Sequence, residues 1–274
     1  MSPGPQRILL LAPHPDDEVV GAAVAARRAI AGGAEVFVLY LTTGVPAAAA
    51  LWLWQRPGHG TRVRRRREEA LAAARLIGLK PAGFLDWPSR SLKSHLAEAE
   101  AAIAGAIAAH GIAALWTPAW EGAHQDHDAA NFLAARFVSR LPVLEFAAYN
   151  YAGGQVRSGE FPPGGEAAGV LELTPEESSW KRRLLVGYAS ERDNLSHIRV
   201  MSESFRPLPA HDYAKSPHPG TLFWERHHWV PFRHPRIDFT RPAALRTALA
   251  AYAASTAAPP PPGASRRPPP SRGR

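Results

Sequence analysis

The chain has 274 residues, contains no cysteine and carries a formal net charge of +8 at pH 7. Without cysteine it cannot use disulfide bonds, thiolate metal ligands or a cysteine nucleophile, so any metal must be bound by nitrogen and oxygen atoms. No apolar segment reaches the roughly 20 residues that a membrane span requires, and the polar start MSPGPQR is unlike a signal peptide. We therefore expect a cytoplasmic protein without a transmembrane segment.

The first 150 residues alternate between strand-like and helix-like patterns. Short runs rich in Val, Leu and aromatic residues predict buried strands, and the longer segments between them predict helices. The predicted strands span residues 6–12, 35–42, 82–87, 112–119 and 142–150. The predicted helices span residues 17–31, 62–77, 91–110 and 127–140. This alternation predicts an α/β fold, with a doubly wound, mostly parallel sheet and helices on both faces.

Two parts of the chain depart from this alternation. Residues 45–61 contain Pro, Gly, Trp52 and Trp54, which predicts a long loop or a lid with a short helix. After residue 150 we expect a strand over residues 169–174, a helix over residues 175–191 capped by Thr174, and irregular packing from about residue 206. The Pro- and Arg-rich end predicts a domain over residues 1–255 and a disordered tail over residues 256–274.

Polar clusters follow two of the predicted strands. PHPDDE, residues 13–18, follows the first strand, and EGAHQDHD, residues 121–128, follows the strand over residues 112–119. Because open α/β sheets bind ligands at the carboxyl ends of their strands, we expect both clusters at the same edge. Each cluster alone has a simpler interpretation, since acids stabilise helix N-termini and histidines occur in solvated loops. The two together indicate a metal site.

Each polar residue of these clusters has a candidate role. A catalytic zinc takes three protein ligands and leaves one position for water. The candidate ligands are His14, Asp17 and His127. Asp16 is a candidate general base, and His124 is a candidate for stabilising an oxyanion or protonating a leaving amine. Asp126 is a candidate for orienting a histidine through its second ring nitrogen.

At these residues the sequence resembles the PIG-L/LmbE-like family of zinc-dependent N-acetylglucosaminyl deacetylases. PHPDDE matches the first hallmark of the family, and residues 124–127 match its H-x-D-H segment. Weaker matches lie at residues 67–79, 180–191 and 202–206, so the resemblance covers about residues 6–206. It implies a Rossmann-like fold, a single Zn²⁺, and hydrolysis of an acetamide on an amino sugar that is a small molecule or part of a glycoconjugate.

The resemblance also implies a role for each matching residue. The implied zinc ligands are His14, Asp17 and His127. Asp16 is the implied general base, and His124 the oxyanion stabiliser or acid with Asp126 as its partner. The sequence departs from the family at Gly122, where some members carry Tyr, so that another group, or Tyr149 or Tyr151, must assist the oxyanion. A second departure is Glu191, where the family carries Gln. Both departures leave the metal ligands intact and bear on the substrate rather than on the reaction.

Two alternative functions remain open. One is an amidase that uses the same metal centre on another amide, such as a sugar-thiol conjugate. The other is a non-catalytic glycan-binding module, against which the complete set of polar residues argues. The basic run at Arg62 and residues 64–67 is interpreted as a solvated helix start rather than an anion site, and no motif for specific nucleic-acid binding accompanies it. Neither the natural substrate nor the oligomeric state follows from the sequence.

Overall fold

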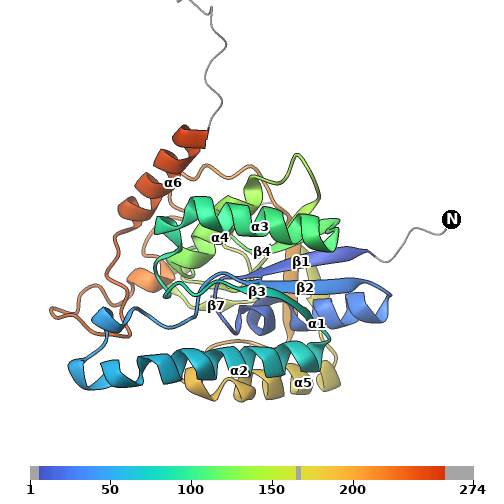
Figure 1. Cartoon of the computed structure of the whole chain (residues 1–274), viewed down its shortest axis with the longest axis horizontal. Coiled ribbons are helices and arrows are strands. Elements are labelled where there is room, and N and C mark those ends of the chain that lie inside the picture. The colour runs from blue at the N-terminus through green and yellow to red at the C-terminus, as the bar shows by residue number, and fades with distance from the viewer. Residues whose placement is uncertain (1–5, 165–167, 257–274) are drawn as a thin grey trace, which may run out of the picture.

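The computed structural model describes residues 6–164 and 168–256. A seven-stranded sheet in the order β3-β2-β1-β4-β5-β9-β8 forms its centre (Figure 1). The first five strands in this order are parallel, whereas β9 and β8 run antiparallel to their neighbours. The strands of the sheet are β1 (Arg7–Ala12), β2 (Glu35–Tyr40), β3 (Lys80–Phe84), β4 (Ala114–Pro118), β5 (Val143–Phe146), β8 (Gly169–Glu172) and β9 (Ser202–Pro207). A separate ribbon pairs β6 (Tyr149–Asn150) with β7 (Arg157–Ser158).

Helices cover both faces of the sheet (Figure 1). They are α1 (Asp17–Ala31), α2 (His59–Ile77), α3 (Leu96–His110), α4 (Gln125–Ala135), α5 (Pro175–Gly187) and α6 (Pro242–Thr256). Successive side chains of a strand point to opposite faces, so Leu10 of β1 packs in the core with α1, α2 and α5. Leu9 and Leu11 pack in the core with α3, α4 and α6. The predicted α/β fold with helices on both faces is confirmed.

Most predicted elements lie within a few residues of the observed ones, with larger differences late in the chain. The segment 45–61 contains the short 3₁₀ helices η1 (Ala48–Ala50) and η2 (Leu53–Gly58), as a loop with a short helix requires. The predicted helix over residues 175–191 ends at Gly187, and Thr174 caps it as expected. Strand β9 and helix α6 were not predicted. The predicted tail lies outside the described residues from residue 257 onward.

A buried ion pair supports the middle of α1. Nζ of Lys181, on α5, donates to Oε1 of Glu203 at 2.7 Å and to the carbonyl of Val20 at 2.9 Å. Glu203, on β9, accepts the backbone N–H groups of Val24 and Ala25 at 3.0 and 2.8 Å. These two residues lie in the weakly matching segments 180–191 and 202–206, and they fix the helix that begins at Asp17.

None of the helices in the described part of the chain is long and apolar enough to cross a bilayer. The carboxyl ends of the parallel strands lie on the left in Figure 1, where Leu51, Gln55 of η2 and residues after 188 line a cavity.

Candidate metal centre

The two polar clusters lie where the order of the sheet reverses. β1 and β4 are neighbours, but β2 and β3 extend the sheet beyond β1, whereas β5 extends it beyond β4. Such a reversal leaves a crevice outside the carboxyl ends of the strands, where open α/β sheets bind ligands. PHPDDE runs from β1 into α1, and EGAHQDHD runs from the end of β4 into α4. Both clusters therefore border this crevice, as the sequence predicted.

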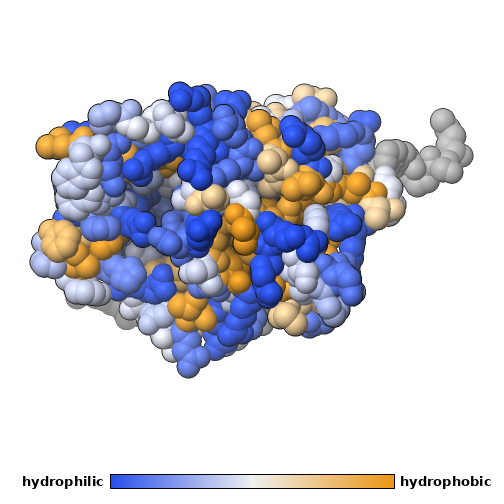
Figure 2. Space-filling view, turned by 90° about the horizontal axis from the view of Figure 1, so that it is seen from below, coloured by the Kyte–Doolittle hydropathy of each residue, from blue (hydrophilic) through white to orange (hydrophobic). Residues whose placement is uncertain are grey.

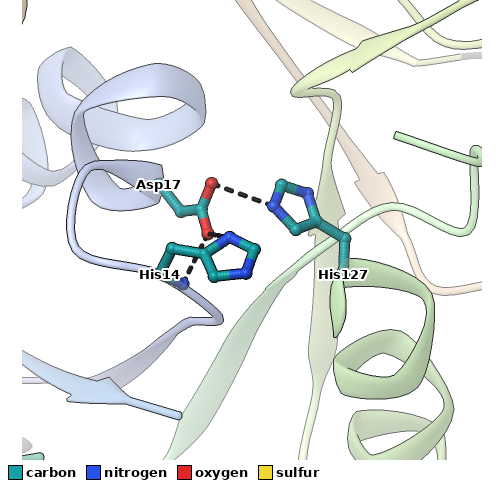
Figure 3. Close-up of side chains that lie close together, drawn as sticks. All are labelled: His14, Asp17 and His127. Atoms are coloured by element: carbon teal, nitrogen blue, oxygen red, sulfur yellow. Dashed lines mark hydrogen bonds and ion pairs between the residues drawn. The ribbon is translucent and has the colours of Figure 1, made fainter. Parts of the chain in front are cut away.

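The three predicted ligands converge on one point (Figure 3). Nδ1 of His14 lies 3.3 Å from Oδ2 of Asp17, and Nε2 of His127 lies 3.1 Å from Oδ1 of the same carboxylate. Their candidate ligand atoms all lie within 4.8 Å of one another, and the three residues are buried. Among the described residues, Nδ1 of His127 has no hydrogen-bond partner, and Nε2 is paired with the carboxylate of Asp17 without good hydrogen-bond geometry. A buried imidazole that faces a carboxylate in this way fits a divalent metal ion bound by nitrogen and oxygen.

Asp126 holds the second ring nitrogen of His14. Its Oδ2 lies 3.0 Å from Nε2 of His14, which leaves Nδ1 to face Asp17. A carboxylate on the outer nitrogen is the usual way in which a ligand histidine is oriented. Burial lowers the pKa of His14, but its hydrogen bonds to Asp126 and Asp17 outweigh burial and raise this pKa to about 10. Burial raises the pKa of Asp17, but His127 and His14 hold it well below its ordinary value. Asp17 therefore stays ionised while His14 carries a proton on each ring nitrogen, and a metal ion bound at Nδ1 would displace the proton there.

A second group, comprising His14, His124 and Asp126, is equally compact. The oxygens of Asp126 are already engaged, because Oδ1 accepts the N–H of Leu92 at 3.1 Å and Oδ2 accepts the N–H of Arg90 at 2.5 Å. In the set that includes His127, Oδ2 of Asp17 accepts the N–H of His14 at 2.7 Å, but Oδ1 accepts no backbone N–H within the described part of the chain and faces His127. This set is thus the better metal site.

Asp16 stands beside this set in an unusual backbone conformation. Its φ of 122° is rare for a residue with a side chain, and Oε2 of Glu18 accepts its N–H at 3.1 Å. Glu18 also accepts the hydroxyl of Tyr188. Two nitrogens of Arg66 lie 3.1 Å from Oδ2 of Asp16. Burial raises the pKa of Asp16 above its ordinary value, and Arg66 offsets part of this rise. The carboxylate is therefore more basic than a solvated one, as a general base requires.

His124 caps helix α4 and faces the cavity with its other nitrogen. Nδ1 accepts the backbone N–H of Asp126 at 3.0 Å, so the ring proton resides on Nε2. Burial, and then the neighbouring His14, hold the pKa of His124 well below its ordinary value. A neutral imidazole with Nε2–H is a hydrogen-bond donor. The carboxylate of Asp126 lies 3.6 Å from Nδ1 of His124 and also hydrogen-bonds His14, so the expected partnership of His124 with Asp126 stays a prediction.

The structure distinguishes between Tyr149 and Tyr151 as the group that could do the work of a tyrosine at position 122. Gly122 has a φ of 69°, and a Cβ there would lie 2.6 Å from the side chain of Leu222, so no larger residue fits without rearrangement. Tyr149 lines the cavity, and its ring lies 5.6 Å from that of His127. Tyr151 instead faces Arg226, at 5.6 Å from its guanidinium. Burial raises the pKa of Tyr149 well above its ordinary value, so its hydroxyl stays protonated.

The metal site forms part of the wall of a cavity of about 1290 Å³. A hollow is visible at the left of Figure 2, the end toward which the parallel strands run. Leu51 and Gln55 of the predicted lid line the cavity. Trp52 and Trp54 stack on each other with ring centroids 5.4 Å apart, and Trp54 is 75% exposed. Neither tryptophan is among the described residues that line the cavity, so the predicted lid contributes other side chains.

Several supporting residues were missed from the sequence. Glu121 is fully buried and accepts the N–H groups of Ala148 and Tyr149 at 2.7 and 3.1 Å, which fixes the tyrosine over the site. Ser89 lies 3.3 Å from Nε2 of His14. Glu121 begins the second polar cluster, so a signal existed. Ser89 follows β3 and carries no local pattern that relates it to the site.

Comparison with known proteins finds one matching family and several solved structures with a similar fold. Residues 9–138 match the family PIG-L, described as GlcNAc-PI de-N-acetylase. A deacetylase solved in complex with teicoplanin, from the biosynthesis pathway of teicoplanin, is 22% identical, with 74% of this chain and 98% of that chain covered and a TM-score of 0.57. The N,N'-diacetylchitobiose deacetylase from Pyrococcus horikoshii is 16% identical, with 79% and 88% covered and a TM-score of 0.54.

An enzyme of a different type has a similar fold. The 4-carboxy-2-hydroxymuconate hydratase from Pseudomonas putida is 19% identical, with 70% of this chain and 82% of that chain covered and a TM-score of 0.50. None of the curated proteins matches the chain significantly. At these identities the solved structures establish the fold alone. The resemblance seen in the sequence is confirmed by the match of residues 9–138 to the PIG-L family.

Proposed function

We propose that the protein is a zinc-dependent hydrolase that removes the N-acetyl group from an N-acetylglucosamine-type conjugate and releases acetate and a free amine. The observation that carries this proposal is the buried set of His14, Asp17 and His127 with a raised-pKa carboxylate beside it at a cavity wall. The similar deacetylases and the PIG-L match support the reaction class. Because a hydratase has a similar fold, the fold alone does not determine the reaction, which depends on the residues of the site.

His14, Asp17 and His127 would hold Zn²⁺, which suits their nitrogen and oxygen donors and leaves a position for a fourth ligand. When bound, the ion supplies Lewis acidity toward water and toward an amide carbonyl. Asp126 keeps His14 oriented through Nε2. The carboxylate of Asp17 stays ionised between the two imidazoles.

The neighbouring side chains account for the remaining steps. A water molecule adds to the acetamide carbonyl carbon, and Asp16 accepts its proton. Nε2–H of His124 and the hydroxyl of Tyr149 donate hydrogen bonds to the oxygen on which negative charge develops. When the C–N bond breaks, the proton on Asp16 passes to the amine nitrogen. The immediate products are acetic acid and the free amine, and transfer of the acid proton to the amine gives acetate and an ammonium group, so atoms and charge balance.

The cavity supports a conjugate rather than a single sugar as substrate. Its volume of about 1290 Å³ exceeds the roughly 300–1,000 Å³ of typical small-molecule pockets. The same size keeps the amidase alternative open, because an acyl group larger than acetyl would fit. A glycan-binding module without catalysis would not require the basic carboxylate of Asp16 and the N–H donor of His124 beside the three candidate metal ligands.

The test is product analysis with purified protein to which zinc has been restored. A panel of N-acetylglucosamine conjugates and of amides with larger acyl groups would be incubated, and both acids and amines would be quantified. Release of acetate in equal amount to free amine supports the deacetylase. Release of only larger acids supports the amidase, and no hydrolysis of any amide contradicts both. The cytoplasmic location expected from the sequence stays a prediction.

A further inference from the structure

Arg226 is an arginine of the cavity wall that the proposed reaction does not use. It follows the short 3₁₀ helix η6 (Phe223–Glu225), and its side chain is half-buried. The guanidinium carbon lies 3.4 Å from the centroid of the Phe223 ring, and Nε donates to the carbonyl of Phe223 at 2.8 Å. Among the described residues, its two terminal nitrogens have neither a hydrogen-bond partner nor a carboxylate within ion-pair distance.

The surroundings of Arg226 lack negative charge. Burial lowers its pKa, and the groups that oppose this effect are the phenols of Tyr149 and Tyr151 rather than a carboxylate. Burial and the charge of Arg226 together lower the pKa of His197 to about 4, so this histidine is neutral at pH 7. A partly desolvated cation without a counter-ion costs free energy, which an incoming anion offsets. Arg226 is therefore prepared to bind an anion.

The position of Arg226 defines which part of a substrate it can reach. The ring of Tyr149 lies 5.6 Å from that of His127, and the ring of Phe223 lies 4.5 Å from that of Tyr149. The guanidinium on Phe223 is thus separated from the metal ligand by two aromatic rings. This separation suits contact with a substituent several bonds away from the acetamide rather than with the reacting carbonyl.

Other arginines on the cavity wall divide into paired and unpaired ones. Arg66 is paired with Asp16 and Arg236 with Asp193, at 3.1 and 3.2 Å. Arg62 and Arg192 also line the cavity, and within residues 6–164 and 168–256 no carboxylate lies within ion-pair distance of either. These two are exposed, so they add a positive field rather than a fixed contact. The cavity away from the metal set is therefore basic.

We propose that Arg226 is the centre of an anion subsite and that the substrate is an amino-sugar conjugate with a phosphate ester or carboxylate beyond the acetamide-bearing ring. The inference rests on the proposed deacetylase function and adds a substrate class to it. Arg226 is the specificity-determining contact, and Arg62 and Arg192 attract the anion. The nearby His197 is a neutral neighbour.

The test compares turnover of three small conjugates. These are the neutral methyl N-acetylglucosaminide, N-acetylglucosamine 1-phosphate and a carboxymethyl N-acetylglucosaminide. We expect the wild type to favour at least one anionic conjugate by about tenfold or more in kcat/KM, as a charge-assisted hydrogen bond allows. Arg226→Met should remove most of this preference, while turnover of the neutral conjugate falls far less. The anionic conjugate that the wild type prefers shows whether the substrate carries a phosphate ester or a carboxylate.

Arg236→Met is the matched control, because Arg236 lies on the same wall but is already paired with Asp193. It should keep the anion preference. Acetate release without any charge preference in the wild type overturns the subsite but leaves the deacetylase function intact. An equal loss of neutral and anionic turnover in Arg226→Met also overturns it.

A binding measurement tests the subsite without catalysis. Calorimetry with N-acetylglucosamine 1-phosphate and with the carboxymethyl N-acetylglucosaminide should give, for at least one of them, an affinity about tenfold or more weaker for Arg226→Met than for the wild type. Equal affinities of the two proteins for both conjugates, or no binding of either conjugate to the wild type, overturn the subsite whether or not acetate is released. If binding depends on Arg226 but no conjugate is hydrolysed, the subsite stands and the proposed function fails.

Discussion

The floor and the rim of the cavity are built in opposite ways. The floor consists of His14, Asp16, Asp17 and His124, which lie at strand ends and helix starts and are held by hydrogen bonds, with the buried His127 beside them. The rim consists of residues 45–61 and 223–238, which contain short 3₁₀ helices and exposed apolar side chains such as Trp54, Trp229 and Phe232. A rigid floor fixes the reaction, whereas an irregular rim can change to suit the substrate.

Among substitutions of the floor, we expect the largest loss of activity at Asp16. We expect Asp16→Asn to keep its metal and to lose about 10²- to 10⁴-fold in kcat, because the amide cannot accept the proton of water. Asp193→Asn is the control, since Asp193 lines the same cavity but is exposed and paired with Arg236. Metal content, thermal unfolding and kcat would be measured on both. Wild-type turnover in Asp16→Asn would show that another group acts as the base.

A substitution of Lys181 tests how strongly its ion pair with Glu203 stabilises helix α1, which begins at the cavity floor. Lys181→Met leaves Glu203 as a buried carboxylate without its cation, so we expect the free energy of unfolding to fall by about 3–5 kcal/mol. Arg28→Ala removes an ion pair to Glu177 on α5 that is partly exposed, and should cost at most about 1 kcal/mol. Urea denaturation of both variants makes the comparison. Equal losses would mean that burial of the Lys181 pair adds nothing.

Tyr149 links the floor to the rim. We expect Tyr149→Phe to lower kcat by about ten- to a hundredfold with little change in stability, because one donor to the developing charge is lost. Tyr151→Phe should have no such effect, since its ring faces Arg226 rather than His127. Steady-state kinetics with one N-acetylglucosamine conjugate would separate the two. Equal behaviour of the two variants would exclude Tyr149 from the oxyanion site.

Trp54 should show the smallest effect. Because its side chain is largely exposed and lies outside the cavity lining, Trp54→Ala should change the free energy of unfolding by no more than about 0.5 kcal/mol. We expect kcat/KM for a small conjugate to stay within about twofold. A large rise in KM would instead show that the tryptophan pair closes over the substrate as a lid.

The floor could be predicted from the sequence because its signals are local. PHPDDE is contiguous, begins at a strand end, and the topology of an α/β sheet brings it to the second polar cluster. The orientation of Asp126 toward His14 could not be predicted, because it depends on which ring of two neighbouring histidines faces the carboxylate. The sequence offers Tyr149 and Tyr151 as groups that could take the place of a tyrosine at position 122, but it contains no pattern that distinguishes between them.

Other features depend on contacts between distant segments. Strand β9, SESFRP, is polar because Glu203 and Arg206 are buried with partners on other elements, so it lacks the apolar pattern of a buried strand. The position of Arg226 relative to Tyr149 depends on the fold of η6 over β6. Helix α6 did carry a signal, since Pro242 begins it and Leu245 and Leu249 are four residues apart and buried.

Zinc content tests the central claim most directly. Purified wild-type protein, dialysed after addition of zinc, should retain about one zinc per chain by elemental analysis, as a site with three protein ligands predicts. His127→Ala should retain almost none while it keeps the fold by circular dichroism, and His234→Ala, a rim residue outside the ligand set, should retain the full amount. A folded wild type that binds no zinc, or a His127→Ala variant that binds as much as the wild type, would contradict the account.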